Sequence, residues 1–227
     1  MQLEVYSDAV CPWCFIGKRR LDRALTPALA EGIDLGWRTY QLYPQIPTAG
    51  MDRDEFMTLR FGGKDKVRDS YRRIEVEGEA EGIAFNFRAI RRMPNTRNAH
   101  RLSILAEGVG RQTALIEQLF QLHFIDGQDV GDQDTLVEAA RRTAIDADIA
   151  RDYLRSDAGL PRMLEELQFA LEMGITGVPC FVIERAFAIP GVQPVEVLTR
   201  YISKAKAHLA ATNAAAAGGA SDPVGDA

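Results

Sequence analysis

The sequence is poor in cysteine and histidine, with only three of each among its 227 residues. So few cysteines exclude the framework of structural disulfides that small secreted domains need. The chain also lacks any run approaching the ~20 apolar residues of a membrane-spanning helix. Its first ten residues, MQLEVYSDAV, lack the basic start and apolar core of a signal peptide. We therefore expect a cytoplasmic protein with no membrane partner.

An excess of positive charge is also missing, since the formal net charge is −5. This balance argues against nucleic acid or an anionic membrane as a partner. Two short basic runs, Lys18-Arg19-Arg20 and Arg91-Arg92, are expected to lie on solvated surfaces. With 46% hydrophobic and 26% charged residues, the composition is that of an ordinary globular protein.

The first forty residues predict a β-α-β unit. Residues 2–6 alternate between apolar and polar side chains, which is typical of a strand. An apolar stripe then predicts a helix over residues 12–29, with Pro12 in the first turn, where its missing N–H has no partner to lose. Residues 33–37 alternate again as a second strand. The two strands should be parallel and joined by a right-handed connection.

From about Pro44 to Met173 the periodicity is that of helices. Apolar residues recur at spacings of three or four, and we see almost no strand pattern. The stripes are Val67, Tyr71 and Ile74; Leu102, Leu105, Ala106 and Val109; Leu115, Leu119 and Leu122; and Leu160, Leu164, Leu167 and Leu171.

The strand pattern returns after Gly174. Residues 180–183 and 186–189 predict a hairpin, although its connection, Glu184-Arg185, lacks the usual Gly or Asn. Pro194 can open a last helix. From residue 210 large apolar residues are scarce, so a disordered tail is expected over 210–227.

These patterns predict an α/β fold without internal repeats. Residues 1–43 and 174–209 would form one discontinuous domain from a β-α-β and a β-β-α unit. Residues 44–173 would form an all-helical insertion between them.

The two cysteines of the motif Cys11-Pro12-Trp13-Cys14 are the candidate reactive groups. A thiol is nucleophilic only as a thiolate. If Cys11 caps the helix, the unpaired N–H groups of the first turn and the helix dipole stabilise negative charge on its sulfur. Cys14 lies one turn further along and more buried. We therefore predict that Cys11 is the exposed attacking sulfur and that Cys14 resolves the mixed disulfide formed on Cys11.

A CxxC pair is also half of a zinc site, which needs four ligands. The chain has no second CxxC and no HxxxH, but Cys180 with His100, His123 or His208 could complete a Cys₃His set. A non-catalytic redox sensor or zinc-binding adaptor is thus an alternative, although no metal is expected. A pair of inert core cysteines is another.

The order strand, CPWC, helix, helical insertion, GVP, strand, strand, helix resembles the thioredoxin fold in its DsbA-like form. Three passages narrow the resemblance: DAVCPWCFIGKRRLDRAL, PNTRNAHRL and GITGVPCFVIERAFAIPGVQPVEVL. They are similar to the FrnE-like branch of cytoplasmic DsbA-family oxidoreductases, near the 2-hydroxychromene-2-carboxylate isomerases and kappa-class glutathione transferases. The resemblance covers residues 2–207.

Taken alone, Pro179 predicts an ordinary trans peptide bond. The resemblance implies instead that it is cis and faces the cysteine pair, with the Val178 backbone pairing an extended substrate. It also implies that the helical insertion overhangs the site and that His100 points toward the resulting groove. The alternative for His100 is a helix residue without such a role.

Other residues near the pair are candidates of lower rank. Pro12 and Trp13 are expected to contact substrate, because an aromatic ring beside a nucleophile offers apolar contact area. Asp8 could tune the thiol, accept a proton, or simply end the strand. Cys180 departs from the family pattern and is expected to be a buried strand residue, unless it can reach Cys11 and form an alternative disulfide.

The resemblance therefore implies a cytoplasmic thiol–disulfide oxidoreductase, acting as a reductase or isomerase on protein or peptide thiols and disulfides. Glutathione or another low-molecular-weight thiol would be a co-substrate, with no tightly bound cofactor, in a monomer or homodimer. A glutathione-dependent isomerase or transferase of small hydrophobic substrates is the alternative. It is weakened because those relatives carry serine where this chain has Cys11.

Overall fold

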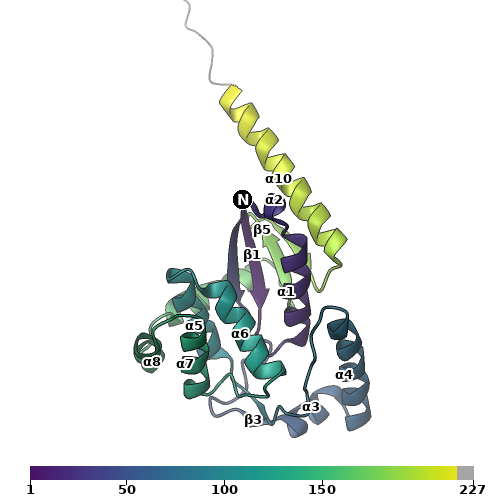
Figure 1. Cartoon of the computed structure of the whole chain (residues 1–227), viewed down its shortest axis with the longest axis vertical. Helices are drawn as coiled ribbons and strands as arrows, with labels where there is room; N and C mark the ends of the chain where they lie inside the picture. The colour runs from purple at the N-terminus through teal and green to yellow at the C-terminus, as the bar shows by residue number, and fades with distance from the viewer. Residues whose placement is uncertain (219–227) are drawn as a thin grey trace, which may run out of the picture.

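The computed structural model describes residues 1–218 and contains a central four-stranded sheet in the order β2-β1-β5-β6 (Figure 1). Strands β1 (Gln2–Ser7) and β2 (Asp34–Thr39) are parallel, as the sequence predicts. Strand β5 (Cys180–Ile183) runs antiparallel to β1, and β6 (Phe187–Pro190) runs antiparallel to β5. The two ends of the chain thus supply one sheet, which is the thioredoxin-like arrangement expected from the sequence.

The helix after the cysteine pair is shorter than predicted. Helix α1 (Pro12–Ala24) ends before Thr26, and a separate short helix α2 (Pro27–Ala30) follows. Thr26 caps α2 by accepting a hydrogen bond from the Leu29 N–H at 3.4 Å. The single helix predicted to Leu29 is wrong because Pro27 cannot donate the backbone hydrogen bond that would continue α1.

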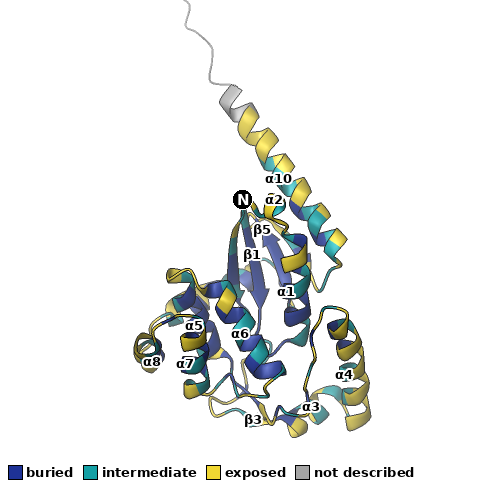
Figure 2. Cartoon of the chain, in the orientation of Figure 1, coloured by how far each residue is buried: buried dark blue, intermediate teal, exposed yellow. Residues whose placement is uncertain are grey.

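Helices cover both faces of the sheet. On one face, Leu3 and Val5 of β1 share a core with side chains of α1, of α6 (Gln112–Phe124) and of α10 (Val195–Gly218). On the other face, Tyr6 and Val182 pack against α9 (Leu160–Glu172). Figure 2 shows β1 and β5, the two central strands of the sheet, as buried along nearly their whole length.

The region between β2 and β5 is mainly helical, as predicted. Its remaining helices are α3 (Arg53–Phe61), α4 (Lys64–Glu79), α5 (Arg97–Gly108), α7 (Gln133–Arg142) and α8 (Ala147–Arg155). Two short strands that the sequence did not predict, β3 (Met51–Asp52) and β4 (Arg92–Met93), pair antiparallel near α3. They tie the start of α3 to the segment that leads into α5.

The predicted apolar stripes are buried on α6 but not on α9. Leu115, Leu119 and Leu122 are all buried. On α9, however, Leu164 and Leu171 are 53% and 69% exposed. The side chains that α9 buries are Met163, Glu166 and Ala170. Helix α9 therefore turns a different face to the sheet than its leucine stripe predicts. Glu166 lies on that buried face, where its carboxylate accepts hydrogen bonds from the N–H and hydroxyl of Thr39 at 2.9 and 2.6 Å.

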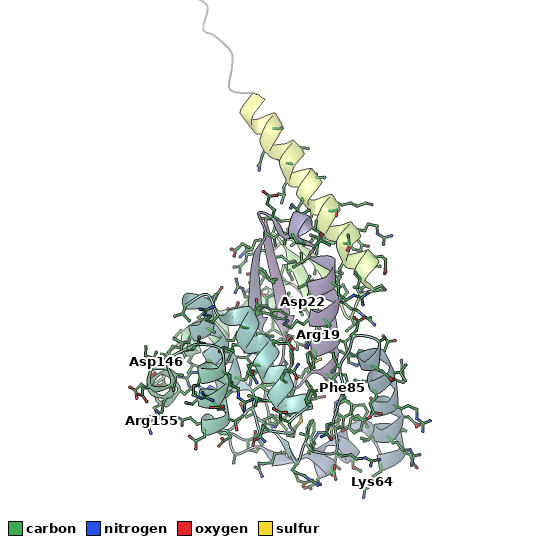
Figure 3. The ribbon with its side chains drawn as sticks, in the orientation of Figure 1. Arg19, Asp22, Lys64, Phe85, Asp146 and Arg155 are labelled. Atoms are coloured by element: carbon green, nitrogen blue, oxygen red, sulfur yellow. The ribbon has the colours of Figure 1, made fainter. Side chains whose placement is uncertain are left out.

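The basic run on α1 is not a solvated surface, which corrects the prediction for two of its residues. Lys18 is buried and lies 3.0 Å from Glu117 of α6. Arg20 pairs with Glu77 of α4 and with Glu81. Because α4 and α6 flank α1, these cations connect the thioredoxin part to the helical block. Figure 3 shows Arg19 and Asp22 on α1 beside this junction.

The C-terminal unit contains the predicted hairpin despite its unusual turn. Glu184 and Arg185 both adopt left-handed backbone conformations, with φ of 51° and 52°. Helix α10 then continues through Gly218, so residues 210–218 are helical rather than a disordered tail. Alanine is the strongest helix former, which the prediction overlooked. The rest of the predicted tail, residues 219–227, lies outside the described residues. Within residues 1–218, no helix is long and apolar enough to cross a membrane.

Candidate active site

Cys11 is the N-cap of α1, as predicted. Its backbone is extended, and its carbonyl accepts hydrogen bonds from the N–H groups of Cys14 and Phe15 at 3.0 and 3.4 Å. The Cys11 N–H donates to the Asp8 carbonyl at 3.0 Å, which fixes the turn after β1. This geometry sets the Cys11 side chain at the positive end of the helix dipole, where negative charge is stabilised.

The two cysteines lie 3.3 Å from each other, and both are free thiols. Burial raises the pKa of Cys14 well above its ordinary value, and the hydrogen bond and charge interaction with Cys11 raise it further. Cys14 is therefore a neutral, buried thiol next to Cys11. This is the asymmetry that attacking and resolving roles require.

The segment before β5 lies against the pair. The Val178–Pro179 peptide bond is cis, which the resemblance implies and the residue type alone does not. The Cys11 thiol donates to the Val178 carbonyl at 3.5 Å. Pro179 approaches α1 so closely that a methyl group at Gly17 would lie 3.0 Å from its Cγ.

A cavity of about 250 Å³ contains Cys11 in its wall. Pro12, Trp13 and Val178 line the same cavity, so these predicted site residues come together. The prediction of an exposed Cys11 is wrong, because the residue is only 3% exposed. The rest of the cavity wall includes side chains from α3, α4 and the segments near them: Leu42, Tyr43, Arg53, Met57, Phe61, Ser70, Tyr71, Ile74, Phe87 and Met93. A substrate sulfur must enter this cavity to reach Cys11.

His100 lies beside Asp8 rather than in the cavity wall. Its Nε2 is 3.5 Å from Asp8 Oδ1, and both residues are buried. The other carboxylate oxygen of Asp8 accepts a hydrogen bond from the Leu42 N–H at 2.8 Å. Both residues thus lie where α5 meets the loops after β1 and β2, and the structure does not place His100 where the resemblance implied.

The histidine that does line the cavity is His123 of α6. The sequence alone suggests His123 only as a candidate fourth zinc ligand. Its Nδ1 donates to the Gln128 carbonyl at 3.2 Å. Burial lowers the pKa of His123 from 6.5 to about 4, so the ring is neutral near pH 7.

Cys180 is separated from the cysteine pair by the sheet. It is buried with Tyr6, Ala170 and Val182 on the face that α9 covers, and burial raises the pKa of its thiol to about 11. The prediction of a buried strand residue is confirmed. Across residues 1–218, no cluster of three or more His, Cys, Asp or Glu side chains has a metal-binding arrangement.

Comparison with known proteins places this geometry in a family. The family model described as a DSBA-like thioredoxin domain matches residues 2–203. The chain is 24% identical over 204 residues to the uncharacterized protein YwbO of Bacillus subtilis, covering 89% of this chain and 96% of the relative.

Two solved structures share the fold. A probable DsbA oxidoreductase from Streptomyces coelicolor is 29% identical with a TM-score of 0.82, covering 100% of this chain and 94% of that one. The cytosolic disulfide reductase DsbM from Pseudomonas aeruginosa, solved with GSH, is 15% identical with a TM-score of 0.63. That match covers 93% of this chain and 98% of the other.

Proposed function

The chain belongs to the DSBA-like thioredoxin domain family of thiol–disulfide oxidoreductases, and from this premise we propose that it reduces or isomerises disulfides through Cys11 and Cys14 in the cytoplasm. One observation carries the proposal: Cys11 caps α1 in a cavity wall, 3.3 Å from a buried Cys14 whose pKa is raised. Val178 and cis-Pro179 would form the side of the site against which the substrate lies.

In the proposed cycle, the Cys11 thiolate attacks one sulfur of a substrate disulfide. The substrate S–S bond breaks, the departing sulfur takes up a proton, and a mixed disulfide remains on Cys11. Cys14 then loses its proton and attacks the Cys11 sulfur, which forms the Cys11–Cys14 disulfide and releases the second substrate thiol. Two electrons thus pass from the two protein thiols to the substrate.

A low-molecular-weight thiol such as glutathione is the proposed reductant that regenerates the pair. Two molecules of the thiol reduce the Cys11–Cys14 disulfide and leave as their own disulfide. The small cavity around Cys11 supports this choice, because only a small thiol or an extended peptide segment can bring a sulfur into about 250 Å³. The related DsbM was solved with GSH, which is consistent with such a co-substrate.

The test is single-cysteine substitution. With dithiothreitol as the reductant, we expect Cys11→Ser to abolish the catalysed reduction of glutathione disulfide and of a peptide disulfide. We expect Cys14→Ser to stop turnover but to accumulate a mixed disulfide, seen by mass spectrometry as a gain of one glutathionyl group. Cys180→Ser is the matched control and should keep wild-type turnover, because Cys180 lies on the opposite face of the sheet. Wild-type turnover by the Cys11→Ser protein would refute the assignment.

A further inference from the structure

A second, larger cavity of about 680 Å³ adjoins the one that contains Cys11. The two share four lining residues: Arg53, Met57, Tyr71 and Phe87. The larger cavity lies along α3, α4 and the segment before β4, and we call it the basic groove. A ligand that enters the Cys11 cavity from this side must pass over the basic groove.

The charge of the basic groove is opposite to that of the whole chain. Six cationic side chains line it but only two carboxylates, those of Asp54 and Glu75, whereas the chain as a whole has a net charge of −5. Its six cationic side chains are those of Arg53, Lys64, Arg68, Arg72, Arg88 and Arg91. Among the residues that the structure describes, only Arg68 of these six is within ion-pair distance of a carboxylate, at 3.0 Å from Asp65.

Arg53 is the notable member of this set because it is buried at the junction of the two cavities. It is only 6% exposed, and its Nη1 donates to the Phe87 carbonyl at 3.3 Å. Its guanidinium lies 4.9 Å from the Tyr71 ring centre and 5.6 Å from that of Phe87. The ring faces offset part of the cost of burying an unpaired cation, but they do not neutralise it.

Tyr71 adds a second polar group at the same place. Its hydroxyl oxygen is buried and makes no well-aligned hydrogen bond among the described residues, although the Arg53 guanidinium lies close to it. A buried hydroxyl without a partner is costly, and one beside an unpaired guanidinium can donate to an anion that the guanidinium also binds. A carboxylate could accept hydrogen bonds from both the Arg53 guanidinium and the Tyr71 hydroxyl.

We propose that the basic groove binds carboxylates of the substrate, so that the protein acts preferentially on thiols or disulfides with acidic groups next to the reacting sulfur. The inference rests on the proposed function of Cys11 and specifies its substrate class. Arg53 and Tyr71 hold the carboxylate nearest the sulfur, and the exposed cations of the groove attract the remaining acidic groups. Acidic peptides and small acidic thiols such as glutathione share this chemistry.

The test compares matched substrates with the full-length protein, with uncharged dithiothreitol as the reductant throughout. The substrates are a disulfide-linked peptide with acidic residues flanking its cysteine, the same peptide with Asn and Gln in their place, glutathione disulfide, and uncharged 2-hydroxyethyl disulfide. At low salt we expect kcat/KM for the acidic peptide or glutathione disulfide to exceed that for the uncharged substrates by about tenfold. The preference should shrink as salt screens the groove.

The variant Arg72→Gln/Arg88→Gln removes two exposed charges of the groove without touching the core. It should lower kcat/KM for the acidic substrates about fivefold more than that for 2-hydroxyethyl disulfide, so that the ratio of the two falls about fivefold. Arg155→Gln is the matched control, since Arg155 is exposed on α8, on the other side of the molecule from Lys64 of the groove (Figure 3). Arg53→Lys keeps the charge but not the planar group, and should weaken the preference while the protein remains folded.

The outcomes separate the inference from the proposed function. A preference for the acidic peptide alone identifies a peptide substrate, and one for glutathione disulfide alone identifies a small thiol. Equal turnover of acidic and uncharged substrates, unchanged by Arg72→Gln/Arg88→Gln, would overturn the inference and leave the function of Cys11 intact. Loss of the proposed function would show itself differently, as turnover of 2-hydroxyethyl disulfide that does not depend on Cys11.

Discussion

At the scale of single residues, His123, which lines the Cys11 cavity, should make the stability of the fold depend on pH. Its pKa is lowered from 6.5 to about 4 by burial, so the unfolded chain binds one more proton than the folded chain between these values. Stability must therefore fall as the pH decreases through this window. From pH 7 to pH 5 this single group should cost about 2 kcal/mol of the free energy of unfolding.

We expect His123→Gln, which can still donate to the Gln128 carbonyl, to remove about 2 kcal/mol of that pH dependence. Urea unfolding at pH 7 and at pH 5 measures it. The carboxylates whose pKa values are lowered, such as Glu81 and Glu117, lose their contribution at lower pH, below about 4.5, and so do not obscure this window. His208→Gln, at an exposed position of α10, is the control. An unchanged pH profile for His123→Gln would show that His123 is not the group that titrates.

The sequence predicts the residues of the site that are neighbours in the chain. Cys11, Pro12 and Trp13 follow from one motif, because a helix start determines their relative positions. The residues that complete the cavity come from α3, α4, α6 and the segments between elements, and which of their side chains face Cys11 depends on how these parts pack. The resemblance implied that His100 faces the cysteine pair, whereas His123 and Arg53 are the residues that line the Cys11 cavity.

At the scale of elements, the contact between α1 and the segment with cis-Pro179 positions the site. Alanine in place of a helical glycine usually stabilises by about 0.5–1 kcal/mol. At Gly17 the added methyl would lie 3.0 Å from Pro179 Cγ, so we expect Gly17→Ala to lose that gain and to destabilise by about 1 kcal/mol. It should also lower kcat/KM, because Val178 must move away from Cys11 with Pro179.

Gly108 of α5 provides the matched control for this prediction. A methyl group there meets nothing within 4 Å, so Gly108→Ala should stabilise or leave the free energy of unfolding unchanged. Urea unfolding and disulfide reduction by both variants test the comparison. Equal effects of the two substitutions on stability and turnover would show that the close approach of α1 to Pro179 does not constrain the site.

Elements were predictable where local pattern and tertiary packing agree. The four strands of the central sheet follow from alternation and from short apolar runs. The hairpin forms although Glu184 and Arg185 must adopt positive φ, because β5 is fixed between β1 and β6. The rotation of α9 was not predictable, because the hydrogen bonds of Glu166 to Thr39 join residues far apart in the chain.

At the scale of the whole molecule, the core does not stop at the boundary between the thioredoxin part and the helical insertion. Phe15 of α1 stacks on Phe120 of α6, with ring centres 5.1 Å apart, and meets Phe85 edge-on at 6.0 Å. Trp37 of β2 donates its indole N–H to Thr113 of α6 at 3.0 Å. These contacts join residues on both sides of the predicted boundary into one buried cluster.

A continuous core predicts that both parts unfold together. Phe120 is 1% exposed, so Phe120→Ala should lower the free energy of unfolding by about 3–5 kcal/mol. Tryptophan fluorescence, which reports on Trp13 and Trp37, and far-UV circular dichroism, which reports mainly on the helices, should shift to lower urea by the same amount. Phe187→Ala, at a ring that is 49% exposed, should cost no more than about 1 kcal/mol. If the helical signal instead persisted after the fluorescence change, the insertion would be an independent domain, and the cavity around Cys11 would have to open and close by motion between two units.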